Sequence, residues 1–89
     1  MDDREEKGFI FPCSYPLKVM GRNTNEFYSV VCAIIESHVP EGNEISYSAR
    51  TSSGDKYLSI TATFTMESRD QMDAIYSDLR ANHLVLMTL

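Results

Sequence analysis

The chain has 89 residues and a formal net charge of −5, with an isoelectric point near 4.8. A domain of this size buries only about 60–65% of its unfolded surface, so we expect one domain with a modest core. The acidic balance argues against a nucleic-acid partner, because phosphate binding needs a basic face. The apolar runs are far shorter than the roughly 20 residues that span a bilayer, so we expect a cytoplasmic protein with no membrane partner.

The start of the chain differs in composition from the rest. Residues 1–8 are charged and end in glycine, which predicts a flexible leader before a single domain over residues 9–89. Cys13 and Cys32 have no metal-binding or redox spacing, so we expect free thiols. The sequence therefore gives no reason to expect a metal site or a cofactor.

The first predicted strand is short. It runs from Leu17 to Met20, because Pro16 lacks the backbone donor that a central strand needs. Gly21 ends it, since glycine adopts backbone angles that are closed to other residues.

The first predicted helix begins at Asn23, which forms a capping-box pattern with Glu26 three positions later. Pro40 and Gly42 end this helix. Side chains at helical spacing predict one buried face, made of Phe27, Val30, Val31, Ile34 and His38.

A hairpin follows, with strands predicted over residues 44–50 and 57–66 and a turn at Ser52 to Asp55. Apolar and polar residues alternate along both strands, so one face of each is expected to be open to water. The apolar residues of the second strand, which we expect beneath the helices, are Leu58, Ile60, Ala62, Phe64 and Met66.

The second helix is predicted from a capping box at Ser68 and Gln71, and Asn82 ends it. Its apolar stripe consists of Met72, Ile75, Tyr76 and Leu79. The last strand, residues 83–89, is apolar on both faces, so we expect it to be either covered on both sides or paired with another molecule. The predicted interface residues are Leu84, Leu86 and Thr88.

This order of elements predicts an α+β fold, the ferredoxin-like βαββαβ plait, with two helices on one face of a four-stranded antiparallel sheet. The threonine-rich open face beside Tyr57 is superficially similar to an RNA-recognition plait. The negative charge and the Ser and Thr residues of the central strand argue against RNA binding.

One stretch has the chemistry of a ligand site, at the junction of the first strand and the first helix. A helix start offers backbone N–H groups and a positive dipole end to an anion, and an arginine adds a charge-assisted contact. The candidate ligand-binding residues are Gly21, Arg22, Asn23, Thr24 and Asn25. Simple helix capping is the alternative interpretation of the same residues. No catalytic set is predicted, because His38 and His83 are interpreted as structural.

Four segments together carry a family resemblance: Phe11-Pro12, the run from Leu17 to Gly21, the turn Ser52-Ser53-Gly54 followed by Tyr57, and the ending Leu84 to Leu89. In these segments the chain resembles the YbeD family of small bacterial proteins, which are described as lipoic-acid-binding regulatory proteins. The resemblance implies a fold like the ACT-type regulatory domain. Such domains pair through their sheets and bind small ligands near the loop after the first strand, here Gly21 to Asn25.

The sequence thus favours a non-enzymatic regulatory module that forms a homodimer or binds a protein partner and senses a small carboxylate such as lipoate. Two alternatives remain. One is a structural adaptor for a larger enzyme. The other is a small enzyme whose site is completed at a dimer seam by Lys18, His83 or Cys13.

Overall fold

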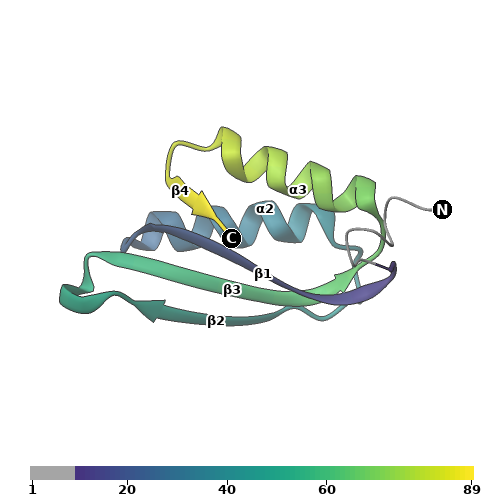
Figure 1. The fold of residues 1–89 in the computed structure, drawn as a ribbon, viewed down its shortest axis with the longest axis horizontal. Helices are drawn as coiled ribbons and strands as arrows, with labels where there is room; N and C mark the ends of the chain where they lie inside the picture. Colours follow the sequence, from purple (N-terminus) through teal and green to yellow (C-terminus); the bar gives the residue numbers. More distant parts are fainter. Residues whose placement is uncertain (1–9) are drawn as a thin grey trace.

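Two helices lie on one face of a four-stranded sheet (Figure 1). The computed structural model describes residues 10–89, so the predicted leader over residues 1–8 lies outside the described residues. The strand order is β2-β3-β1-β4, and every neighbouring pair is antiparallel. The elements are β1 (Cys13–Arg22), α2 (Asn25–His38), β2 (Ser46–Thr51), the short 3₁₀ turn η1 (Ser53–Asp55), β3 (Tyr57–Met66), α3 (Arg69–Ala81) and β4 (Val85–Thr88). This order confirms the predicted ferredoxin-like α+β fold.

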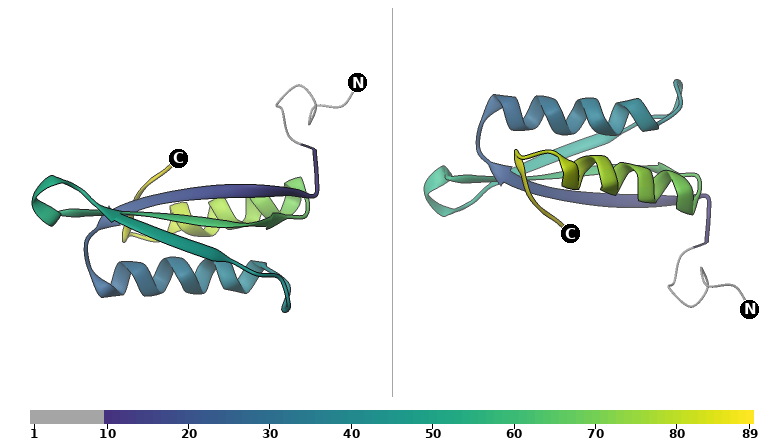
Figure 2. Two further views of the ribbon diagram at one scale, coloured as in Figure 1. Left: turned by 90° about the horizontal axis from the view of Figure 1, so that it is seen from below. Right: turned by 90° about the horizontal axis from the view of Figure 1, so that it is seen from above.

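The first strand is longer than predicted at both ends, because β1 begins at Cys13, includes Pro16 and continues through Gly21 to Arg22. Gly21 therefore does not end the strand, and it pairs with Leu58 of β3. Pro16 pairs with Thr63 of β3 on one side, whereas β4 reaches only the stretch from Val19 to Gly21 on the other side. The first half of β1 is therefore an edge strand, where the missing N–H of proline is tolerated. Figure 2 shows how short β4 is beside β1.

The buried face of α2 is rotated slightly from the predicted one. Phe27, Val31 and Ile35 are fully buried, whereas Ile34 is only half-buried. Ile35 was missing from the predicted stripe, although the spacing of four residues from Phe27 through Val31 continues to it. The buried stripe of α3 agrees better, since Met72, Ile75 and Leu79 all lie in the core.

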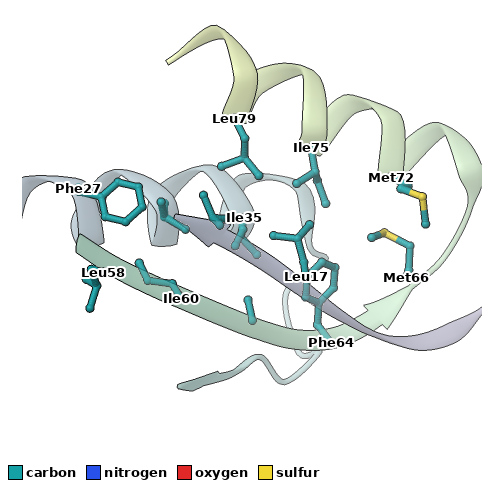
Figure 3. Close-up of a cluster of buried hydrophobic side chains, with 13 residues drawn as sticks. Leu17, Phe27, Ile35, Leu58, Ile60, Phe64, Met66, Met72, Ile75 and Leu79 are labelled. Atoms are coloured by element: carbon teal, nitrogen blue, oxygen red, sulfur yellow. The ribbon is translucent and has the colours of Figure 1, made fainter. Parts of the chain in front are cut away.

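The core lies between the helices and the sheet (Figure 3). The five predicted residues of β3 are all buried, which confirms the predicted alternation of this strand. In Figure 3, Phe27 lies at one end of the core, and Met66 and Met72 lie at the other end. Each buried side chain of this size contributes roughly 1.5–3 kcal/mol, so this face holds the helices on the sheet.

Neither of the two helices within residues 10–89 lies on the opposite face of the sheet (Figure 1). Its side chains come from the alternate positions of the strands, such as Lys18, Arg50 and Thr61. Neither helix within residues 10–89 is long and apolar enough to cross a membrane.

Candidate functional site

Gly21 lies where the end of β1, the start of α2 and the start of β4 approach one another most closely. A methyl group at this position would lie 2.5 Å from a ring carbon of Phe27 and 2.6 Å from the carbonyl oxygen of Leu84. Real Cβ atoms do not approach neighbours so closely, so glycine is needed here for packing. The predicted loop from Gly21 to Asn25 therefore starts at a tightly packed junction of three elements.

The cap of α2 is Thr24 and not Asn23, which corrects the predicted capping box. Thr24 Oγ1 accepts a hydrogen bond from the N–H of Phe27 at 3.0 Å. Asn23 is used elsewhere, because its backbone N–H donates to the carbonyl oxygen of Lys56 and its side-chain amide donates to that of Asp55, both at 3.0 Å. Asn23 thus ties the loop to the β2–β3 connection, and the cap of α2 lies one residue later than predicted.

Seven residues enclose a hollow of about 220 Å³ at this junction, which we call the β4–α2 hollow. They are Arg22, Thr24, Glu26, Phe27, His83, Leu84 and Leu86. Two of the five predicted ligand-binding residues, Arg22 and Thr24, line it directly. Gly21 contributes through its close packing with Phe27 and Leu84. Asn23 and Asn25 are exposed residues of the loop and helix start that do not line the hollow.

The second wall of the hollow comes from the predicted interface strand. Leu84 packs partly against the core, and Leu86 sits at a shift in the β1–β4 register with 55% of its surface exposed. Thr88 is half-buried opposite Val19 and does not line the hollow. The structure thus brings Leu84 and Leu86, two of the three predicted interface residues, together with Arg22 and Thr24 of the predicted ligand loop.

The electrostatics of the hollow are mixed. Arg22 is exposed, and its guanidinium carbon lies 5.9 Å from the centre of the Tyr57 ring, a cation–π distance. Within the described residues, the first-turn N–H groups of Asn25 and Glu26 have no hydrogen-bond partner. The Glu26 carboxylate lies beside these donors and opposes a second negative charge. At one end of the hollow, a ligand would meet the Arg22 cation and the N–H groups of the helix start. Elsewhere in the hollow it would contact the apolar side chains of Phe27, Leu84 and Leu86.

Three residues of the hollow were not predicted: Glu26 and Phe27 as lining residues, and His83, which was interpreted as structural. Glu26 and Phe27 belong to α2, whereas His83 lies in the turn before β4, so nothing in the sequence spacing links His83 to the other two. The link arises from the strand order, which places the start of β4 against the end of β1.

A larger hollow of about 560 Å³ lies beside the end of α2 and β2, and its charged lining residues are acidic. Glu36 and Glu41 line it, and the Tyr47 hydroxyl donates to Glu36 at 3.1 Å. Burial, together with the nearby Cys32 and Glu36, raises the pKa of Tyr47 above its ordinary value. This acidic lining disfavours a carboxylate ligand.

The groups that could form a catalytic site lie apart. His38 Nε2 and Asp78 Oδ2 are 2.7 Å apart and join the end of α2 to α3. Cys13 packs partly against the core, Lys18 faces the open side of the sheet, and His83 borders the β4–α2 hollow. Both cysteines are free thiols. Within residues 10–89, no three His, Cys, Asp or Glu residues cluster in a way that could hold a metal ion.

Two solved structures share this fold. The solution structure of protein HP0495 from H. pylori matches with a TM-score of 0.73 and 18% identity, over 91% of this chain and 85% of that one. The crystal structure of the ACT domain from GTP pyrophosphokinase of Chlorobium tepidum matches with a TM-score of 0.61 and 11% identity, over 86% of this chain and 97% of that one. At these identities the likeness concerns the fold, and it confirms the expected ACT-like architecture.

The relatives in sequence cover all or nearly all of the chain. A UPF0250 protein of Chromobacterium violaceum is 38% identical over 89 residues, which is 100% of both chains. A UPF0250 protein of Hahella chejuensis is 38% identical over 86 residues, covering 97% of this chain and 94% of the relative. The family model described as "Protein of unknown function (DUF493)" matches residues 6–89. The chain therefore belongs to the DUF493 family of UPF0250, or YbeD-like, proteins.

Proposed function

We propose that this chain is a non-enzymatic regulatory module that binds a small carboxylate with an apolar body, such as lipoate, in the β4–α2 hollow. One observation carries the proposal: Arg22 and the open start of α2 meet the leucine surface of β4 in a single hollow. A charged head group and an apolar chain would each find matching surface there. The small volume, about 220 Å³, favours a ligand smaller than a typical drug-sized molecule.

The same hollow supports a coupling between ligand binding and self-association. Leu86 lines the hollow and is also exposed on β4, which has no strand on its outer side among the described residues. A second copy that pairs along β4 would cover Leu86, so ligand and partner would contact the same side chain. Any such coupling is reciprocal: a ligand that tightens the dimer is itself bound more tightly by the dimer.

Calorimetry with the purified chain tests the ligand. We expect heat of binding with lipoate and with octanoate, which shares the carboxylate and the apolar chain but lacks the dithiolane ring. Arg22→Gln removes the cation and should weaken binding about tenfold, equivalent to about 1.4 kcal/mol. Arg69→Gln, a matched loss of charge on α3, should leave binding unchanged. Absence of heat at millimolar ligand from a folded sample would refute the ligand.

Sedimentation tests the association. The mass of the chain should rise with protein concentration, and lipoate should shift the midpoint of that rise. Leu86→Glu should keep the chain monomeric, because it places a charge on the exposed edge of β4. A chain that stays monomeric at all concentrations and ignores lipoate would favour the adaptor alternative, in which β4 pairs with a different protein.

A further inference from the structure

The two layers of the protein differ in charge. The chain has 13 Asp and Glu against 8 Lys and Arg, yet none of its four strands contains an acidic residue. Among the described residues, all carboxylate side chains lie in the two helices or in the connections. Lys18 and Arg50 lie on the strands, at positions that face away from the helices. The part of the open face around Lys18 and Arg50 is therefore basic on an acidic protein, whereas Glu44 lines a separate hollow with Ser46 and Thr63 at the other end of the sheet.

The strand register arranges this open face in rows. The N–H of Leu89 donates to the carbonyl oxygen of Lys18 at 2.9 Å, which continues the β1–β4 pairing by one residue. Residues that pair across antiparallel strands share a face, so each row runs from β4 through β1 and β3 to β2. One row is Leu89, Lys18, Thr61 and Ser48, and the next is Met87, Met20, Ser59 and Arg50.

The basic half of the open face surrounds a hollow of about 450 Å³ between β1 and β2. Lys18 and Arg50 line it together with hydroxyl groups of Ser48, Ser59 and Thr61. Within residues 10–89, neither the Lys18 ammonium nor the Arg50 guanidinium has an ion-pair partner or a hydrogen bond. The hollow therefore holds two cations and three hydroxyl groups, and among the described residues no carboxylate lines it. Such a surface is complementary to acidic groups.

The other half of the open face is apolar. Met87 and Leu89 expose 50% and 58% of their surface, and the half-buried Met20 lies next to Met87. Methionine adapts its shape to different partners, and it is common on surfaces that bind amphipathic helices. The open face thus has an apolar strip along β4 and β1 and a basic strip that extends to β2.

We propose that this open face binds an amphipathic acidic helix of a partner protein. Neighbouring strands lie about 4.8 Å apart, so β4 to β2 spans roughly 14 Å. A helix with its side chains is about 10–12 Å wide, and one lying along the strands fits this width. Its apolar side would cover Met20, Met87 and Leu89, and its carboxylates would reach Lys18 and Arg50. The inference builds on the proposed regulatory role, because it names the chemistry of the partner, but it uses a different surface from the β4–α2 hollow.

A second copy of the chain fits this face less well. The apolar stripes of α2 and α3 are already buried in the core, so neither helix presents an amphipathic face to another molecule. Contact between the basic sheet of one copy and the acidic helices of the next would also be head-to-tail, which produces closed rings or open filaments and not a simple dimer. A separate acidic helix is therefore the occupant that matches both strips.

The probe is a fluorescently labelled 18-residue peptide, with leucine along one helical face and glutamate along the other, added to the full chain. Anisotropy should show binding that weakens as salt is raised. A peptide with lysine at every glutamate position should bind at least tenfold more weakly. Lys18→Gln/Arg50→Gln should reduce affinity for the acidic peptide at least tenfold, whereas Arg69→Gln/Arg80→Gln, the same loss of charge on α3, should not.

Met87→Ser/Leu89→Ser tests the apolar strip and should also weaken binding of the acidic peptide, with the fold checked by circular dichroism. Three results would overturn the inference: no binding of the acidic peptide, equal binding of both peptides, or unchanged affinity in Lys18→Gln/Arg50→Gln. A lower sedimentation mass of that double variant would assign the face to a second copy instead. Lipoate calorimetry on the same variant separates the two proposals, because its β4–α2 hollow is intact.

Discussion

The two helices begin in the same way and yet leave different surfaces. Thr24 caps α2 and Ser68 caps α3, and each hydroxyl accepts from the N–H three residues later, at 3.0 and 3.1 Å. The third helical residue differs. At α3 it is Gln71, whose amide oxygen accepts from the N–H of Glu67 at 2.6 Å and whose amide nitrogen donates to the carbonyl oxygen of His38 at 2.8 Å.

At α2 the equivalent residue is Phe27, which turns into the core against Gly21. Among residues 10–89, no side chain hydrogen-bonds back over this helix start in the way Gln71 does, and the space beside it becomes the β4–α2 hollow. A strand-to-helix junction is therefore not a ligand site by itself, because a side chain of the helix can hydrogen-bond over the helix start, as Gln71 does. The third helical residue distinguishes the two junctions: Phe27 leaves the start of α2 open, whereas Gln71 covers the start of α3.

The largest expected effect is that of Gly21→Ala, which should lower the free energy of unfolding by about 2–3 kcal/mol. The added methyl group collides with the Phe27 ring and with the Leu84 carbonyl, and overpacking of this kind costs about 1–3 kcal/mol. Thr65→Ala is the matched control, because Thr65 also stands three residues before a cap but is exposed. Urea unfolding of both variants measures the difference, and an equal loss in the two would contradict tight packing at Gly21.

The sequence was sufficient for the elements whose signals are local. The alternation of β3 and the capping residues of α3 each lie within a few neighbouring positions, and the structure agrees with both. The predicted start of β1 is wrong, because Pro16 excludes only a central strand. Among residues 10–89, β1 has a neighbouring strand on one side only at Pro16, since β4 pairs with β1 only from Val19 to Gly21. On the other side, the pairing of β1 is limited by the shortness of β4, which begins at Val85, 69 residues after Pro16.

The candidate site was predictable in part for the same reason. The loop from Gly21 to Asn25 carries its own signal, a glycine before a helix start. The wall formed by His83, Leu84 and Leu86 depends on β4 pairing with β1 and on the register shift next to Gly21. Neither feature is encoded in local spacing, so the sequence indicated two separate surfaces where the structure has one hollow.

An intermediate effect is expected for Gln71→Ala, which opens the start of α3. The substitution removes the hydrogen bonds to Glu67 and His38 and should cost about 1–2 kcal/mol in unfolding free energy. The amide proton of Glu67 should also exchange faster with solvent, as hydrogen exchange measured by NMR would show. Ser77→Ala, at an exposed position of the same helix, controls for the added alanine. If the two variants were equally stable, the closure of α3 by Gln71 would be disproved.

The smallest effects concern the caps. Thr24→Ala and Ser68→Ala should each lower the free energy of unfolding by about 1 kcal/mol, because each removes the acceptor for a first-turn N–H. Thr24 lines the β4–α2 hollow, so its loss should also weaken lipoate binding in calorimetry, whereas Ser68→Ala should leave the binding unchanged.

Asn23→Ala decides between the predicted cap and the observed one. The Asn23 side chain donates to the exposed carbonyl of Asp55 and not to the helix, so its removal should cost less than that of Thr24 and leave α2 intact. Circular dichroism and urea unfolding of the two variants make the comparison. A larger loss from Asn23→Ala would restore the capping box with Glu26 and move the helix start back by one residue. The open N–H groups at the β4–α2 hollow would then be covered by a cap, and the difference between the two junctions would disappear.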